Sequence, residues 1–479
     1  MHKTRVIEST LGCPQKNRTE SECYEGVQTY MDMKDGSLIA MQSNKDDLMS
    51  RILSPDNLNR AYLQVVRNKG VGGVDKMYCR QLLPYLGQHK SELIESILIG
   101  KYKPNPVRRV EIPKDNGKKR LLGIPTVVDR LIQQAIAQVL SPIYECQFSQ
   151  SSFGFRPNRS AHGALLQVCR YASEGYKYAV GIDLARFFDT VNHSFLLRIL
   201  SRTIKDGRVI SLIHKYLTSG VMLGKHYEPS MEGTPQGGPL SPLPGNIMLN
   251  ELDKELERRG HRFVRYADDS MILCKSKSSA ERVCVSITAF VEKELHLIVN
   301  HDKTEVGYIR GMKYLGYSFY FTKGKCRLCV HKKTKDKFKR KVKSLTGRSN
   351  GMGYARRKEE LWQTFRGWME YFKYADMKGM LIPLDQWYRR RLRMCIWKCW
   401  KRVKTRFVNL QKCGIPKGKA WEWANTRKGY WHISKTYILH RALRDESLLQ
   451  AGYPLLKPLY EQMHIDCETA TCGTACVVV

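Results

Sequence analysis

Long hydrophobic segments are missing from this 479-residue sequence, and their absence excludes two large classes of protein. No apolar run approaches the roughly 20 residues that a membrane-spanning helix needs. Residues 1–30 are polar and lack the apolar core of a secretory signal peptide. We therefore expect a cytoplasmic protein rather than an integral membrane protein or a secreted one.

Acidic residues are scarce relative to basic ones. Asp and Glu number 45 against 81 Lys and Arg, which gives a formal net charge of +36 and an isoelectric point near 9.7. A folded protein with this excess repels itself, so a polyanionic partner is expected, and nucleic acid is the favoured one. An anionic membrane surface is the alternative. Because the basic residues are spread over several segments, we expect no membrane partner.

Cysteine is too dilute for a disulfide scaffold: the 15 cysteines are irregularly spaced along the 479 residues. This spacing excludes a disulfide-stabilised scaffold and indicates a reducing compartment. Cys326 and Cys329 have a spacing compatible with zinc, but no second close pair accompanies them. A structural zinc site is therefore the weaker interpretation.

Composition divides the chain into four segments. Residues 1–45 are polar and weakly patterned, which predicts a loosely ordered extension. Residues 46–330 mix strand and helix patterns and predict an α+β domain. Residues 331–460 begin with the densely basic stretch 332–348 and continue as long helical patterns, which predicts an all-helical domain. Residues 461–479 are interpreted as an unstructured tail.

Local patterns within the α+β segment place several elements. An Asn-Gly pair between two strand-like runs predicts a hairpin over residues 107–123. Helical periodicity covers residues 128–140. An apolar run predicts a buried strand over 178–184, and residues 261–275 are expected to form strand, tight turn and strand. Further strands are expected within 312–330.

Two of these strand segments end in carboxylates. Asp183 closes the apolar run at 178–184, and Asp268 and Asp269 lie at the turn between two apolar strands. Carboxylates at the ends of core strands are costly to bury unless they are paired. If the strands are neighbours, the three carboxylates meet at one sheet edge and repel one another unless cations lie between them. The alternative, that each Asp caps a turn or faces solvent, fits a single Asp better than this combination.

Magnesium suits such a cluster, because the ion prefers oxygen ligands and retains water and phosphate in its shell. Two ions about 3.5–4 Å apart would lower the pKa of a primer 3′-hydroxyl and stabilise a leaving pyrophosphate. The pattern therefore predicts in-line nucleotidyl transfer with Asp183, Asp268 and Asp269 as catalytic metal ligands.

The chain resembles the bacterial group II intron-encoded proteins, in which a reverse transcriptase is joined to a maturase domain. The resemblance extends from about Leu48 to Leu459. Its motifs follow the family's order and lie at residues 111–114, 120 with 123–130, 153–157, 178–184, 233–242, 266–269 and 313–316, with a maturase helix signature at 366–372.

The resemblance implies a right-hand polymerase fold with fingers and palm, followed by a helical thumb. It also implies roles for individual residues. Asp183 and Asp268 would bind both Mg²⁺ ions, Asp269 would complete the acidic cluster, and the Leu184 carbonyl would face the triphosphate-bound ion. The residues implied to bind the deoxynucleoside triphosphate are Phe188 as a steric gate against the ribose 2′-hydroxyl, Lys114 and Arg120 as finger cations, and Gln236. For Lys114 and Arg120 a solvated hairpin charge is the alternative, for Phe188 a core position and for Gln236 an ordinary loop position.

Two departures from the family pattern occur near these positions. Pro244-Gly245 replaces the usual Leu-Ala at a helix entrance, where Gly costs roughly 1 kcal/mol. Ala185-Arg186 replaces the usual acidic-Lys pair. Neither change removes a catalytic group, and both leave open a protein with reduced polymerase activity.

The basic helical segment combines Arg and Lys with aromatic residues at helical spacing, and we interpret Trp362, Phe365, Trp368 and Phe372 as core. The remaining faces suit folded RNA, whose backbone presents dense charge. The expected RNA-binding residues are Arg366, Arg389, Arg390, Arg391 and Arg393.

The resemblance implies that this surface grips the protein's own group II intron RNA and assists splicing. Further implied partners are an RNA template with a DNA primer, and target DNA, with association to the bacterial nucleoid during intron mobility. No endonuclease module is recognised, as in the compact class C members. Two alternatives remain: a splicing maturase with weak or lost polymerase activity, and a stand-alone reverse transcriptase without an intron partner.

Overall fold

The computed structural model describes residues 31–34, 37–40, 47–113, 117, 119–224 and 226–465. The side chain of Arg120 and those of residues 31–40 lie outside this description. The chain forms two compact units, Met1–Tyr308 and Ile309–Val479. Each unit is considered by itself below.

The first unit mixes helices and strands. Its helices are α1 Leu48–Leu53, α2 Pro55–Arg67, η2 Cys79–Gln81, α3 Leu82–Leu98, α4 Val127–Glu145, α5 Ala161–Ser173, α6 Phe187–Thr190, α7 His193–Thr203, α8 Gly207–Leu217, α9 Pro242–Arg258 and α10 Lys277–Lys293. Its strands are β1 Met31–Lys34, β2 Ser37–Ala40, β3 Val107–Pro113, β4 Lys119–Ile124, β5 Tyr178–Ile182, β6 Val221–Leu223, β7 His226–Glu228, β8 Arg262–Tyr266, β9 Asp269–Cys274 and β10 Glu305–Tyr308.

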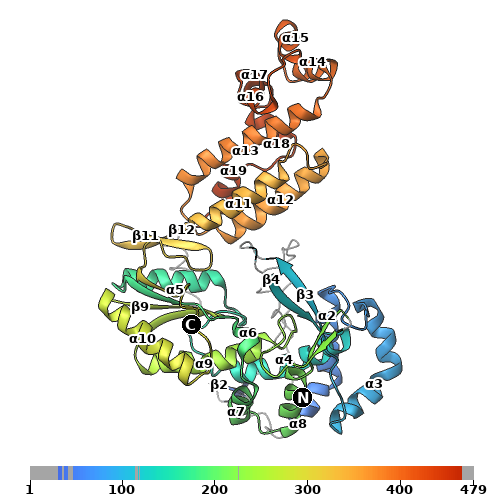
Figure 1. Cartoon of the computed structure of the whole chain (residues 1–479), viewed down its shortest axis with the longest axis vertical. Helices are drawn as coiled ribbons and strands as arrows, with labels where there is room; N and C mark the ends of the chain where they lie inside the picture. Colours follow the sequence, from blue (N-terminus) through green and yellow to red (C-terminus); the bar gives the residue numbers. More distant parts are fainter. Residues whose placement is uncertain are drawn as a thin grey trace. The chain divides into compact units, whose positions relative to one another are not determined.

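The central sheet has the strand order β10-β5-β9-β8, and every neighbouring pair is antiparallel. Helix α10 packs on β5, β9 and β10, and α5 packs on β8 (Figure 1). The apolar residues of β5 and β9 are buried, which explains why both segments lack the alternation of a half-exposed strand. The strand–turn–strand prediction for 261–275 is confirmed.

A second sheet, of order β4-β3-β6-β7, contains the hairpin predicted over 107–123. Strands β3 and β4 are antiparallel, with Ile112 opposite Arg120 and Arg108 opposite Ile124. The turn that joins them, apart from Gly117, lies outside the described residues. The hairpin itself is therefore confirmed, while the geometry of its tip is not described.

Helix α4 forms where the sequence predicted a helix over residues 128–140, and a polar cluster holds its first turn. Thr126 is the N-cap and accepts a hydrogen bond from the backbone N–H of Asp129. Asp129 is 1% exposed and accepts hydrogen bonds from the hydroxyls of Thr126 and Tyr102, both at 2.6 Å. Burial raises the pKa of the Asp129 carboxyl. This cluster therefore joins the first turn of α4 to Tyr102, in the segment before β3.

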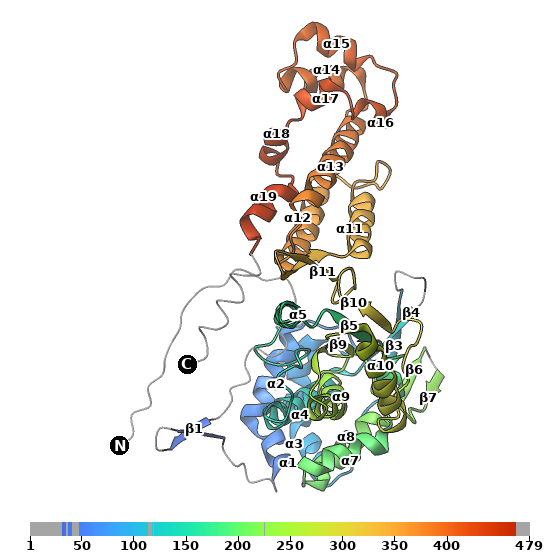
Figure 2. The same cartoon turned by 90° about the vertical axis from the view of Figure 1, so that its left-hand side faces the viewer.

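The second unit begins with an antiparallel hairpin and continues as helices. It contains β11 Tyr317–Thr322, β12 Lys325–Val330, α11 Lys332–Leu345, α12 Tyr354–Tyr371, α13 Lys378–Cys399, α14 Val403–Lys412, α15 Lys417–Ala424, α16 Tyr430–Ile433, α17 Tyr437–Ala442, α18 Asp445–Gln450 and α19 Leu456–Met463. Helices α11, α12 and α13 run alongside one another (Figure 2), and α19 packs on both α12 and α13.

The division between the units lies at Tyr308 and Ile309, about twenty residues before the change of composition at residue 331. The β11–β12 hairpin explains the difference: it packs with the helices that follow, for example through Tyr317 and Phe372, whose ring centroids are 4.8 Å apart. Within the predicted extension, β1 and β2 form a short hairpin. In the predicted tail, residues 461–463 complete α19, and residues 466–479 lie outside the described residues.

Candidate active site

The three aspartates of the predicted cluster lie at one edge of the central sheet. Strand β5 ends at Ile182, which pairs with Ser270 of β9, so Asp183 follows directly at the end where β9 begins. Strand β9 begins with Asp269, which pairs with Tyr266 of β8. Because antiparallel neighbours continue in register, Asp183 and Asp269 leave the sheet side by side.

The side chains at this edge have different surroundings. Asp268 and Asp269 are exposed. Asp183 is half-buried, and its Oδ2 accepts hydrogen bonds from Lys303 Nζ at 2.8 Å and from Asn300 Nδ2 at 3.0 Å. Across the ranges that the structure describes, no three acidic, His or Cys side chains are gathered as a metal site. The strand pairing brings the three aspartates to a common sheet edge, as predicted. Their side chains do not form a three-ligand group there.

The donor set nonetheless fits magnesium. Leu184 and Val299 form an isolated antiparallel β-bridge. On one side of it the backbone N–H of Asn300 donates to the Asp183 carbonyl, and on the other side the N–H of Ala185 donates to the Ile298 carbonyl, both at 2.8 Å. In this antiparallel pattern the carbonyl of Leu184 points away from that neighbour. Three carboxylates and one outward carbonyl at a partly exposed edge are the oxygen ligands that Mg²⁺ prefers.

Phe188 lies on the short helix α6, which begins just after the sheet edge. Its half-buried ring meets the ring of Phe187 edge to face, with the centroids 5.0 Å apart. The Phe188 carbonyl accepts a 2.6 Å hydrogen bond from the backbone N–H of Thr234. A Cβ on Gly233, whose φ is +84°, would approach the same carbonyl to 2.8 Å. The glycine-rich loop 233–240 therefore lies directly against the predicted steric gate.

Gln236 joins this loop to the second sheet. Its backbone carbonyl accepts a 2.7 Å hydrogen bond from Gly123 of β4. A Cβ on Gly237, whose φ is +117°, would come within 2.5 Å of the Gly123 carbonyl. The loop thus connects Phe188 on one side with the strand that contains Arg120 on the other. Lys114 and the side chain of Arg120 lie outside the described residues.

The departure at Pro244-Gly245 has a packing explanation. Helix α9 begins with Pro242, and Pro244 lies in its first turn, where proline is tolerated. A Cβ on Gly245 would lie 3.2 Å from the ring of Phe187 and 3.4 Å from that of Phe188. The absent Cβ leaves room for both rings. At the second departure, Arg186 adopts a left-handed φ of +50° as the N-cap of α6.

Four residues around the site were missed by sequence reasoning: Asn246, Arg265, Asn300 and Lys303. Arg265 offered one signal, since it is a charged residue within the otherwise apolar strand segment 263–267. Asn300 and Lys303 offered none, because they reach Asp183 from more than a hundred residues away.

Comparison with known proteins identifies the family of the chain. Residues 112–319 match the family described as "Reverse transcriptase (RNA-dependent DNA polymerase)", and residues 335–414 match "Group II intron, maturase-specific domain". Protein YkfC of Escherichia coli (strain K12) is 33% identical over 311 residues, which cover 56% of this chain and 82% of YkfC. The chain belongs to the group II intron reverse transcriptase and maturase family.

Two further family members bear intron-related names. Group II intron-encoded protein LtrA of Lactococcus lactis subsp. cremoris is 31% identical over 347 residues, covering 58% of this chain and 57% of LtrA. Nuclear intron maturase 2, mitochondrial, of Arabidopsis thaliana is 30% identical over 203 residues, covering 34% of this chain and 28% of that protein. The chain therefore spans little more than half the length of LtrA.

The maturase-specific region presents a continuous basic surface on α11. Phe338, Val342 and Leu345 form the buried stripe of this helix, and Phe338 stacks on Trp368 with the ring centroids 4.3 Å apart. Most of the remaining positions are exposed and basic, whereas Thr334 and Lys335 are half-buried. We call the exposed basic residues the α11 basic face, which consists of Lys332, Lys333, Lys337, Lys339, Arg340, Lys341 and Lys343. None of the described helices is both long and apolar enough to cross a membrane.

Of the four core aromatics predicted on and just after α12, two are confirmed and Trp368 is half-buried. Phe365 is 0% exposed and Phe372 is 5% exposed. Trp362 is a correction, because it is 41% exposed and its indole N–H donates to the Gly452 carbonyl at 3.1 Å. On the same helix Arg366 is exposed, and its role in RNA binding stays a prediction.

The predicted arginines of α13 make internal contacts. Arg389 pairs with Asp445, and Arg390 lies 3.8 Å over the ring of Trp431. Arg391 donates to the Thr346 hydroxyl at 2.6 Å and so closes the C-terminal end of α11. These three side chains are partly buried, so they hold helices together on one side and reach the surface on the other.

Arg393 requires a correction. Its side chain is 5% exposed, its Nε donates to the Leu443 carbonyl at 3.1 Å, and burial lowers its pKa to about 10. This residue joins α13 to the segment before α18 and does not face a partner. Helical spacing alone did not reveal the inward orientation, because it depends on α18.

Proposed function

We propose that this protein is an RNA-directed DNA polymerase that also binds group II intron RNA to assist its splicing and mobility. The observation that carries the proposal is the placement of Asp183 at the end of β5, beside the turn that contains Asp268 and Asp269. These strands are far apart in sequence, and their common edge gives the chain a set of oxygen ligands that a structural role does not require.

Asp183, Asp268, Asp269 and the Leu184 carbonyl are the groups that would hold two Mg²⁺ ions. When bound there, the metal supplies charge that lowers the pKa of the primer 3′-hydroxyl and stabilises the leaving pyrophosphate. The chain's own part is to fix these oxygens on strand ends, where the backbone cannot shift freely.

The residues proposed to hold the deoxynucleoside triphosphate surround the same edge. The ring of Phe188 packs edge to face against Phe187. We propose that the Phe188 ring excludes a ribose 2′-hydroxyl. Gln236 lies on a loop that is hydrogen-bonded to β4 and to α6, so its backbone position is determined by both. Lys114 and Arg120 on the β3–β4 hairpin are proposed to bind the triphosphate, since paired cations recognise phosphate oxygens well.

The α11 basic face and Arg366 are proposed to bind the intron RNA. Binding of group II intron RNA is supported by the maturase-specific match and by the related intron-encoded proteins. An exposed helix face with this density of Lys and Arg can contact several phosphates at once. RNA template, DNA primer and target DNA are the further proposed partners.

A second candidate is a splicing maturase whose polymerase is weak or lost. It is favoured by the contacts of Asp183, whose carboxylate accepts hydrogen bonds from Lys303 and Asn300. Splicing of a flanking intron without cDNA synthesis would support this candidate over the first.

The direct test is cDNA synthesis by the purified protein. With Mg²⁺, an RNA template, an annealed DNA primer and four deoxynucleoside triphosphates, we expect primer extension to the end of the template. Chelation of Mg²⁺ by excess EDTA should stop extension, because the three carboxylates then lack the cations that neutralise their charge. No extension under any divalent cation, with intron RNA still bound, would reject the polymerase half of the proposal.

The α11 basic face is tested through the salt dependence of RNA binding. Arg340→Gln together with Lys341→Gln should make the slope of log binding constant against log salt concentration less negative by about 1.5. Each lost phosphate contact removes roughly 0.7–0.9 from the magnitude of that slope. The matched control is Lys277→Gln with Lys293→Gln, which removes equal charge from exposed positions of α10. Equal slopes for the two double variants would show that net charge, and not this face, binds the RNA.

A further inference from the structure

A buried ion pair lies directly behind the turn that contains Asp268 and Asp269. Arg265 of β8 and Asp253 of α9 have side chains that are 1% and 0% exposed. The guanidinium donates from Nε to Asp253 Oδ1 at 2.7 Å and from Nη2 to Oδ2 at 2.5 Å. Such a two-point pair fixes the plane of the guanidinium, because both oxygens must be met at once.

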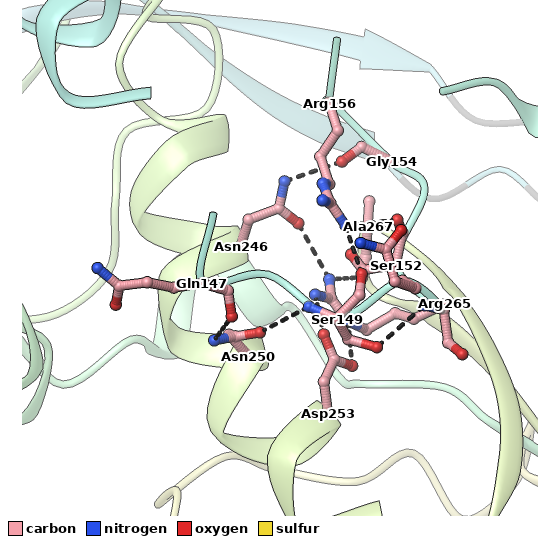
Figure 3. A network of polar contacts seen from close by, with 12 residues as sticks. Gln147, Ser149, Ser152, Gly154, Arg156, Asn246, Asn250, Asp253, Arg265 and Ala267 are labelled. Atoms are coloured by element: carbon pink, nitrogen blue, oxygen red, sulfur yellow. Dashed lines mark hydrogen bonds and ion pairs between the residues drawn. The ribbon is translucent and has the colours of Figure 1, made fainter. Parts of the chain in front are cut away.

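The third nitrogen of Arg265 reaches the turn itself. Its Nη1 donates to the Ala267 carbonyl and to Asn246 Oδ1, each at 3.0 Å (Figure 3). Ala267 has a left-handed φ of +55°, a conformation that costs an L-residue roughly 1–2 kcal/mol. A turn with this backbone is maintained only if its surroundings hold it. The bond from Arg265 supplies one such restraint.

A second restraint comes from the segment 149–156. Gly154 lies so close to the turn that an added Cβ would come within 2.3 Å of the Ala267 nitrogen. The Gly154 carbonyl accepts a 2.8 Å hydrogen bond from Asn246 Nδ2 (Figure 3). The same segment is held by Arg156, which pairs with Glu145 at 2.6 Å and is 4% exposed. Asn246 therefore bridges both supports of the turn.

We propose that Asn246 and Arg265 are positioning residues for the polymerase reaction: through them α9 and the segment 149–156 hold the Ala267 turn and so place Asp268 and Asp269. The inference rests on the proposed function, because it assigns the turn a catalytic role. Neither residue touches a substrate. Their effect is transmitted through the backbone at Ala267.

Helix α9 offers a matched control for this assignment. Asn250 lies one helical turn after Asn246, and the two are 4% and 3% exposed. Asn250 also makes two hydrogen bonds to a neighbouring loop, accepting from the Ser149 N–H at 3.3 Å and donating to the Gln147 carbonyl at 3.1 Å (Figure 3). It forms none of the bonds that reach Arg265 or Ala267. Asn250 contacts the segment 149–156 only at its first residue, Ser149, so the pair separates direct restraint of the turn from support of the neighbouring segment.

The test compares Asn246→Ala with Asn250→Ala in the full chain. We expect the two to lower the melting temperature by similar amounts. Asn246→Ala alone should lower kcat about 100-fold with KM for the deoxynucleotide within about 3-fold, because a small misplacement of reacting groups costs rate rather than binding. Amide hydrogen exchange at residues 267–270 should become about 10-fold faster in that variant only. If Asn246→Ala does not fold, Asn246→Ser replaces it in the comparison, because the serine keeps a small hydrogen-bonding hydroxyl at this position of α9.

Two outcomes would overturn the inference. One is unchanged exchange at residues 267–270 in Asn246→Ala and Asn246→Ser. The other is an equal loss of kcat in the Asn246 and Asn250 variants at equal stability, which would reduce Asn246 to ordinary packing. Because hydrogen exchange needs no catalysis, a wild-type protein without polymerase activity would reject the proposed function while leaving the restraint on the turn measurable.

Discussion

Replacing Asp268 and Asp269 together by alanine should reduce cDNA synthesis on the order of 10⁴-fold, as expected when groups that act as one unit are removed. Both side chains are exposed at the end of a buried hairpin, so their loss leaves the core of β8 and β9 intact. The unfolding midpoint should therefore change little. Primer extension on an RNA template, with rates measured under single-turnover conditions, gives the comparison.

RNA affinity is the decisive companion measurement. The α11 basic face belongs to the second compact unit, so intron RNA binding by the double variant should stay within about 3-fold of the wild type. Asp302→Ala, which removes another exposed carboxylate close to Lys303 in sequence, should leave synthesis nearly unchanged. A parallel loss of synthesis and RNA binding in the double variant would mean that Asp268 and Asp269 maintain the fold instead of the chemistry.

The double variant also separates the two candidate functions. If it still assists splicing of a flanking intron while making no cDNA, the maturase and polymerase activities reside in different groups of the same chain. If the wild type assists splicing and makes no cDNA either, the protein is a maturase whose polymerase has been lost.

Shortening the proposed steric gate should change sugar selection. Phe188→Leu removes the distal part of the ring, and incorporation of ribonucleotides relative to deoxynucleotides should rise about 100-fold, near the upper range of discrimination by a pocket's shape. The hydrogen bond from the Thr234 N–H to the carbonyl of residue 188 involves only backbone atoms, so it persists in the variant. Competition between paired ribo- and deoxynucleotides on one template measures the ratio.

The neighbouring ring provides the control. Phe187 is 3% exposed within the core, so Phe187→Leu should lower the unfolding free energy by about 1 kcal/mol without altering sugar selection. An unchanged ribonucleotide ratio in Phe188→Leu would assign that ring to packing alone. A similar change of ratio in both variants would show that the gate depends on the ring pair, which Gly245 of α9 accommodates.

Much of the first unit could be predicted because its local patterns are strong. The apolar runs at β5, β8 and β9, the Asn-Gly signal of the β3–β4 hairpin and the periodicity of α4 all correspond to observed elements. Strand β10 was missed because it is only four residues long and mixes the strand formers Val306 and Tyr308 with Glu305 and Gly307. Its pairing with β5 depends on a partner far away in the chain, which no local pattern reveals.

The orientation of helical side chains was the weaker prediction in the second unit. Periodicity separates the faces of α13, yet it does not say which neighbour covers each face. Arg393 is buried because the segment before α18 lies against it, and Trp362 is exposed where a core position was expected. Both errors concern contacts between helices that are distant in sequence.

The order of residues along the chain was enough to indicate the chemistry, because carboxylates that end apolar strands have few other uses and their motifs occur in the family's order. It could not indicate what stands beside those carboxylates. Lys303 and Asn300 at Asp183, and the buried pair of Arg265 with Asp253 behind the turn, arise when segments separated by many residues fold together. Folding removes water from Arg265 and Asp253, and a buried charge then requires a partner that only packing can bring to it.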